Sequence, residues 1–218
     1  MNNSNNTKIV YFVRHGQSND NAAPVFQSLD SPLSAEGKKQ AQAVARRISK
    51  LSFDGLITSP ILRAKETAEI ISQQTGKKPV FSELFVERVK PDAILGKPYI
   101  DTKANLLWKE WEKSLYTPGL HVEDGENFGD LILRADKALD FLEKRTETSI
   151  VVVSHGYFLR TIIARVLLGN SLSGENFHNF QKFISMHNTA ITILKFESAF
   201  EENTCWRLDT YNDYSHLA

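Results

Sequence analysis

The stretch that decides the fold is KIVYFVRHG, residues 8–16. Its apolar part, Ile9–Val13, is a continuous run rich in β-branched side chains, which is typical of a strand covered on both faces in a parallel sheet. Arg14, His15 and Gly16 follow it directly. Because sites in open α/β sheets gather outside the carboxyl ends of the strands, the position of this histidine indicates chemistry.

The same pattern occurs a second time, near residue 150. The apolar run Ile150–Val153 is followed by Ser154, His155 and Gly156. Parallel strands of one sheet end at the same edge, so we expect His155 to approach His15 there.

Composition limits the class of protein. The chain has 218 residues, of which 41% are hydrophobic and 24% charged, as in an ordinary globular protein. This length fits one domain spanning 1–218. The formal net charge is zero, so we expect no nucleic acid or membrane partner. The sequence leaves the oligomeric state open.

The amino-terminal residues and the cysteine content suggest a cytoplasmic location. Residues 1–7 are rich in Asn and lack the basic and apolar regions of a signal peptide, so we expect a disordered tail there. No apolar stretch approaches the roughly 20 residues that span a bilayer. The single cysteine, Cys205, excludes an intrachain disulfide and suits a reducing compartment.

Strand and helix patterns alternate along most of the chain. The predicted strands after the first cover 53–57, 79–84, 150–153, 189–196 and 206–211, and the predicted helices cover about 34–51, 60–75, 128–142 and 158–168. Between about 86 and 125 the alternation stops, and this stretch holds three of the seven prolines. We therefore predict a three-layer α/β/α sandwich with a mostly parallel central sheet, an antiparallel edge strand and a lid insertion at 86–125.

Polar side chains follow several of these strands. Arg63 lies in the opening turn of the predicted helix after the second strand, and Glu87 follows the third. With Arg14, His15 and His155 they gather two guanidiniums and two imidazoles, which repel one another unless an anion lies between them. A helix N-terminus beside an arginine fork suits a phosphate. We expect a phosphoryl group at this edge.

Several motifs carry a family resemblance. The run RHGQS at 14–18 with Asn21 resembles the R-H-G-[EQ]-[TS]-x-x-N signature of the histidine phosphatase superfamily, the phosphoglycerate mutase-like fold. The segments 33–41, 59–64 and 84–87 are similar to further motifs of that family in the same order. The pieces at 125–126, 153–156 and 188 complete a resemblance that spans about residues 8 to 196.

The resemblance implies a mechanism. His15 would attack phosphorus and form a phosphohistidine, while Arg14, Arg63 and His155 bind the phosphoryl oxygens. His155 would act best as an imidazolium whose pKa the bound anion raises. Glu87 would protonate the leaving oxygen.

The resemblance also assigns the residues that line the phosphate site, and it indicates whether a cofactor is needed. Gln17, Ser18 and Asn21 would form the phosphate loop, and Gly156 would belong to the same phosphate site. The chemistry needs no cofactor and no metal, and the sequence has no obvious cluster of metal ligands.

Without the resemblance, the sequence allows other roles for two of these residues. Arg63 can pair with Glu66 or Glu69 on its own predicted helix. Glu87 has a neighbouring carboxylate, Glu83, that offers the same chemistry, and Arg88 offers an ion pair.

The resemblance leaves three functions to separate. The segment 88–93 departs from the pattern that mutases keep after the acidic residue, and the lid insertion is longer than in relatives that act on protein phosphohistidine. We therefore expect a phosphoric monoester hydrolase acting on a small-molecule phosphomonoester, with inorganic phosphate as product. A phosphoglycerate mutase-type phosphotransferase and a catalytically weak phosphate-binding scaffold are the alternatives.

The lid sequence leaves the leaving group open. Arg88, Lys90 and Lys97 are suited to a second acidic group, or form a solvated loop. Phe85, Trp108 and Trp111 favour an apolar leaving group if they face the pocket.

Overall fold

The computed structural model describes residues 7–198 and 204–218. Its strands are β1 (Lys8–Arg14), β2 (Gly55–Thr58), β3 (Pro79–Phe81), β4 (Ser149–Ser154), β5 (Ile191–Ser198) and β6 (Thr204–Asp213), and its helices are α1 (Ala35–Ile48), α2 (Leu62–Thr75), α3 (Thr102–Lys113), α4 (Phe128–Glu143), α5 (Gly156–Leu168) and α6 (Gly174–Phe183). The tail predicted at 1–7 lies outside the described residues except for Thr7.

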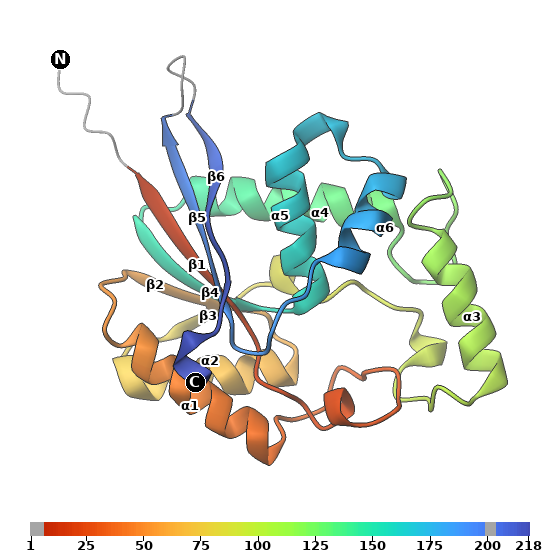
Figure 1. The fold of residues 1–218 in the computed structure, drawn as a ribbon, viewed down its shortest axis with the longest axis horizontal. Helices are drawn as coiled ribbons and strands as arrows, with labels where there is room; N and C mark the ends of the chain where they lie inside the picture. The colour runs from red at the N-terminus through yellow and green to blue at the C-terminus, as the bar shows by residue number, and fades with distance from the viewer. Residues whose placement is uncertain (1–6, 199–203) are drawn as a thin grey trace.

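The strands form one six-stranded sheet in the order β3-β2-β4-β1-β5-β6. The pairs β2–β3, β2–β4 and β1–β4 are parallel, whereas β5 runs antiparallel to both β1 and β6. Helices α1 and α2 cover one face of the sheet, and α4 and α5 cover the other (Figure 1). The predicted α/β/α sandwich with a mostly parallel sheet and an antiparallel edge is confirmed.

The apolar run of β1 is buried because it feeds both hydrophobic cores. Val10 and Phe12 pack into the core under α4 and α5, and Val13 packs into the core under α1 and α2. Strand β4 beside it is buried from Ile150 to Ser154. Side chains alternate between the two faces of a strand, so each face of a central strand needs an apolar set.

Several predicted boundaries differ from the structure. Helix α2 begins at Leu62 and its N-cap is Ile61, so Pro60, predicted as the start of the helix, precedes it. Strand β3 ends at Phe81 because the next residues turn into a 3-10 helix, Glu83–Phe85.

Two helices also differ from the predictions. Helix α5 begins at Gly156, directly after His155, which is two residues earlier than predicted. Helix α6 was not predicted at all, although Ser173 caps it by accepting a hydrogen bond from the backbone of Asn176.

The segment 86–125, which was predicted as a lid insertion and is called the lid below, contains α3 and lies beside the carboxyl end of the central strands (Figure 1). Backbone hydrogen bonds join it to the loop after β1, since Phe26 donates to Lys97 and Tyr99 donates to Pro24. Trp108 packs against Phe26 with ring centroids 6.0 Å apart. Within the described residues, no helix has the length and apolar character needed to cross a membrane.

Candidate active site

The pairing of β1 with β4 brings the two histidines together. Arg14 and Ser154 are in register at the last position of the two strands, so the next residues, His15 and His155, leave the sheet side by side. Their ring centroids lie 5.0 Å apart. Both side chains are fully or almost fully buried.

Hydrogen bonds fix the orientation of the His15 ring. Nδ1 donates a hydrogen bond of 2.7 Å to the carbonyl oxygen of Gly16, so Nδ1 carries the proton and Nε2 keeps its lone pair. Arg63 Nε donates to that Nε2 over 3.2 Å. The backbone carbonyl of His15 accepts a hydrogen bond of 2.9 Å from the Asn188 side chain. The ring therefore has the tautomer that a nucleophilic imidazole requires at Nε2.

The local electrostatics favour neutral histidines. Burial lowers the pKa of His15 well below its ordinary value of 6.5, and the guanidiniums of Arg63 and Arg14 lower it further. Burial also lowers the pKa of His155 well below 6.5, and the charges of Arg63 and then of His15 lower it further. Ser59 Oγ lies 2.8 Å from His155 Nε2.

The two arginines approach the histidines from different elements. Arg63 stands in the first turn of α2 and is 1% exposed, and its Nη1 donates to the Ser28 carbonyl over 2.8 Å. Arg14 ends β1 and donates to the Met186 carbonyl. A Cβ at Gly156 would lie 3.1 Å from Arg14 Nε, so the glycine leaves room for this guanidinium.

The alternative partners suggested for Arg63 are engaged elsewhere. Glu66 accepts a hydrogen bond of 2.6 Å from the backbone of Leu33, and Glu69 lies 3.9 Å from Lys65. Arg63 is therefore directed at His15 and does not pair on its own helix.

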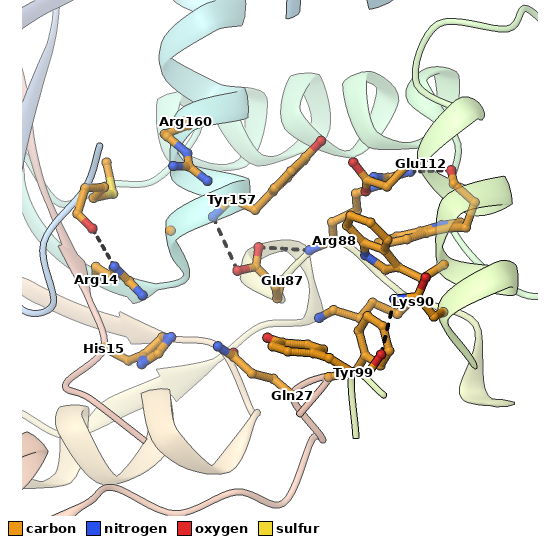
Figure 2. A pocket seen from close by; sticks show the side chains of 16 residues that line it. Arg14, His15, Gln27, Glu87, Arg88, Lys90, Tyr99, Glu112, Tyr157 and Arg160 are labelled. Carbon is orange, nitrogen blue, oxygen red and sulfur yellow. Dashed lines mark hydrogen bonds and ion pairs between the residues drawn. The ribbon is translucent and has the colours of Figure 1, made fainter. Parts of the chain in front are cut away.

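Glu87 lies at the N-terminus of α5. Its carboxylate accepts hydrogen bonds from the backbone N–H groups of Phe158 at 3.0 Å, Arg88 at 3.0 Å and Tyr157 at 3.3 Å. Figure 2 shows this carboxylate near the centre of the pocket, facing the space in front of His15. The neighbouring carboxylate, Glu83, is exposed and lines an adjoining cavity instead.

Arg134, on α4, fixes the segment that carries Glu87 and was not found by sequence reasoning. It pairs with Glu126 at 2.7 Å and donates to the carbonyls of Leu84, Val86 and Glu87. No motif marked it, because its role depends on the packing of α4 against the lid.

The remaining predicted phosphate-loop residues bond mainly to one another and to α1. Gln17 Oε1 accepts a hydrogen bond of 2.8 Å from Ser34 Oγ. Ser18 and Asn21 exchange two bonds of 3.2 Å between side chain and backbone. These contacts hold the loop after β1 in place, and direct phosphate contact by the three side chains stays a prediction.

A pocket of about 550 Å³ opens in front of His15. Its walls come from the end of β1, the start of α5, the loop after β1 and the lid. Lining side chains that the site prediction had not assigned include Gln27, Tyr99, Asn105, Glu112, Tyr157 and Arg160. Figure 2 shows Gln27 reaching toward His15. A second cavity of about 530 Å³, mostly aliphatic, adjoins the pocket and shares Gln27, Glu87, Arg88 and Lys90 with it.

Comparison with known proteins assigns the family. The sequence model described as "Histidine phosphatase superfamily (branch 1)" matches residues 10–213. The chain belongs to the histidine phosphatase superfamily. The probable phosphoglycerate mutase GpmB of Escherichia coli is 30% identical over 212 residues, which are 95% of this chain and 94% of that protein.

Solved structures of this superfamily share the fold. Bacillus stearothermophilus YhfR is 25% identical with a TM-score of 0.76, and the match covers 96% of this chain and 99% of that one. A phosphoserine phosphatase mutant from Entamoeba histolytica, solved with phosphoserine, is 24% identical with a TM-score of 0.75 and the same coverage. The phosphoglycerate mutase-like fold and the family expected from the motifs are confirmed.

Within the described residues, no group of three or more His, Cys, Asp or Glu side chains is arranged to hold a metal ion. Arg14 and Arg63 provide positive charge beside His15. The arrangement can bind a phosphoryl group and present an unprotonated imidazole nitrogen to it.

Proposed function

We propose that this chain is a metal-independent phosphomonoesterase that forms a phosphohistidine on His15 and acts on a small-molecule phosphate. The observation that carries the proposal is the orientation of the His15 ring. Its Nδ1 is bonded to the Gly16 carbonyl at 2.7 Å, and its Nε2 faces the Arg63 guanidinium. A phosphoryl group bound by that guanidinium lies within reach of the nucleophilic nitrogen.

The first chemical step is an in-line displacement at phosphorus. His15 Nε2 forms a bond to phosphorus while the bond to the leaving oxygen breaks. Arg14 and Arg63 bind the phosphoryl oxygens and stabilise the charge of the transition state. Glu87 acts as the general acid and donates a proton to the leaving oxygen.

The second step releases phosphate. A water molecule gives a proton to the Glu87 carboxylate and attacks phosphorus, and the bond from phosphorus to His15 Nε2 breaks. Glu87 is then protonated for the next turnover. His155, beside His15, contacts the same phosphoryl group, and a bound dianion opposes the effect of burial and raises the pKa of this histidine.

A hydrolysis assay with a chelator tests the proposal. We expect the protein to hydrolyse p-nitrophenyl phosphate in excess chelator, and the His15→Ala variant to lose this activity. Loss of activity in chelator that returns with added metal would contradict metal independence. A wild-type protein with no turnover on a broad panel of phosphomonoesters would favour the phosphate-binding scaffold.

The mutase alternative has one observation in its favour, the 30% identity to proteins named probable phosphoglycerate mutase. Incubation with 3-phosphoglycerate and a bisphosphoglycerate primer separates the two activities. We expect free phosphate and no 2-phosphoglycerate. Isomerisation at a rate above phosphate release would favour the phosphotransferase.

A further inference from the structure

Lys90 is a cation of the pocket that the two chemical steps do not use. It follows Glu87 by three residues, and Figure 2 shows its side chain extending into the pocket toward Gln27. No carboxylate of the described residues lies within ion-pair distance of its ammonium group. The described fold therefore gives this charge no salt-bridge partner.

The position is costly for a charged group. Burial lowers the pKa of Lys90; Glu87 raises it, and the guanidiniums of Arg63 and Arg88 lower it further. Lys90 is half-buried, and an ammonium group held partly out of water without an ion-pair partner destabilises a fold. A ligand that supplies a negative charge at this point removes that cost.

The other two basic residues of this part of the lid are placed differently. Arg88 pairs with Glu112 at 2.7 Å and lies 3.5 Å above the ring of Trp111, so it holds the lid together. Lys97 is exposed and does not line either cavity. Of the three lid cations considered from the sequence, Lys90 alone combines access to the pocket with a free charge in the described structure.

Charge balance in the pocket points to an acidic substrate. A phosphoryl dianion is matched by Arg14 and Arg63, and Glu87 carries no charge when it is protonated as the acid. The positive charges of Lys90 and Arg160 are then not balanced by a negative charge. Arg160 lines the same pocket and donates only to a neutral group, the Ile184 carbonyl, at 3.0 Å. A monoester with a neutral leaving group leaves both cations unmatched.

We propose that Lys90 binds a second anionic group, a carboxylate or a second phosphate, on the leaving group of the substrate. The inference rests on the proposed phosphatase function and adds the substrate class to it. The preferred substrates are acidic phosphomonoesters, and neutral ones are poor substrates.

Two matched pairs of substrates test the proposal. 3-Phosphoglycerate and glycerol 3-phosphate share a three-carbon skeleton and differ by a carboxylate. The bisphosphate and the monophosphate of 1,3-propanediol differ by a phosphate. We expect kcat/KM for the acidic member of at least one pair to exceed that of the neutral member by about tenfold or more, and the favoured pair identifies the anionic group.

The Lys90→Met variant assigns the preference to this side chain. We expect the ratio of kcat/KM for the acidic substrate to kcat/KM for the neutral one to fall to between about 0.5 and 2, chiefly through a higher KM for the acidic substrate. The kcat/KM for glycerol 3-phosphate should stay within about threefold of the wild-type value. The matched control is Lys97→Met, which removes an exposed lysine of the same lid and keeps the preference. A wild-type protein without preference in either pair, or a Lys90→Met variant that keeps it, overturns the proposal.

Binding to the His15→Ala variant separates this proposal from the proposed function. Calorimetry of this variant with 3-phosphoglycerate, glycerol 3-phosphate and the propanediol phosphates needs no turnover. Tighter binding of an acidic member that is lost on adding Lys90→Met supports the anion contact even if the wild-type protein hydrolyses nothing. Equal affinities within both pairs contradict the contact even if the wild-type protein is an active phosphatase.

Discussion

Arg63 Nε donates a hydrogen bond to His15 Nε2 over 3.2 Å, so the guanidinium and the nucleophilic nitrogen face each other directly. The hydrogen bond uses the lone pair that must attack phosphorus. A phosphoryl group that binds between the two side chains replaces this bond, taking the guanidinium as its ligand and the imidazole as its nucleophile.

Removing the Arg63 guanidinium is expected to abolish most of the activity. We predict that Arg63→Met lowers kcat/KM for p-nitrophenyl phosphate by about 10²-fold to 10³-fold, because it removes a donor aimed at the transition state. The control is Lys65→Met, on the same helix, where the side chain pairs only with Glu69 at 3.9 Å. A loss below tenfold in Arg63→Met would show that this guanidinium does not bind the reacting phosphoryl group.

Replacing Glu87 should affect substrates according to their leaving groups. Glutamine keeps one oxygen, which can accept the backbone bonds that Phe158 and Arg88 donate to Oε1, and loses the acceptor for the longer bond from Tyr157. Its amide group cannot act as a general acid. We expect Glu87→Gln to lower kcat on an alkyl phosphate by about 10²-fold or more, and on p-nitrophenyl phosphate, with its better leaving group, much less.

Glu83→Gln is the matched control for this prediction, because Glu83 is the exposed neighbouring carboxylate. Its rates on both substrates should stay close to those of the wild-type protein. An equal loss on both substrates in Glu87→Gln, or a leaving-group effect in Glu83→Gln, would rule out Glu87 as the acid.

The buried histidines predict a pH dependence of stability. Burial lowers the pKa of His15 and His155 well below 6.5, and it lowers that of His216 to about 4. The unfolded chain therefore binds more protons than the folded chain as pH falls below 6.5. The free energy of unfolding should fall in that range, by up to about 1.4 kcal/mol per pH unit for each histidine.

Urea unfolding at pH 7.5 and pH 5.5 measures this effect. The double variant His15→Asn with His155→Asn should show a smaller loss of stability between the two pH values than the wild-type protein, since two of the shifted groups are gone. A wild-type protein equally stable at both pH values would be inconsistent with neutral, buried imidazoles.

Gly37 predicts an unusual response to alanine. Alanine normally stabilises a helix relative to glycine by about 0.5–1 kcal/mol. Here a Cβ at Gly37 in α1 would lie 1.9 Å from the carbonyl oxygen of Gln17, in the loop that follows His15. We expect Gly37→Ala to lower the free energy of unfolding and to reduce activity, as measured by urea unfolding and phosphate release.

The matched substitution is Gly129→Ala in α4, where the nearest atom to the added Cβ is 3.3 Å away, on the side chain of Asn127. It should cost less stability than Gly37→Ala. If Gly37→Ala is as stable and active as the wild-type protein, the close contact between α1 and the loop after β1 is wrong.

Much of the site could be predicted because its residues follow strands directly in the sequence. The apolar runs before His15 and His155 indicate buried parallel strands, and the register of such strands brings the next residues together. Arg63 was predictable from the turn after β2, although its helix begins later than expected.

The lid could not be predicted from its sequence, because its structure depends on contacts with distant elements. Arg88 and Lys90 are two residues apart and both basic, yet one is bound to Glu112 and Trp111 and the other faces the pocket. The loop containing Gln27 takes its position from backbone bonds to the lid, which no local pattern reveals. Trp111 is buried, and both Trp108 and Trp111 line the pocket.

Trapping the covalent intermediate tests the central claim most directly. The wild-type protein is mixed with a phosphomonoester, quenched in alkaline denaturant within one turnover, digested and analysed by mass spectrometry. The account predicts a phosphoryl group, stable to alkali and labile to acid, on the peptide carrying His15, and none in the His15→Ala variant. An active protein that carries no phosphoryl group on His15 at any quench time, or carries it on His155 instead, would contradict the account.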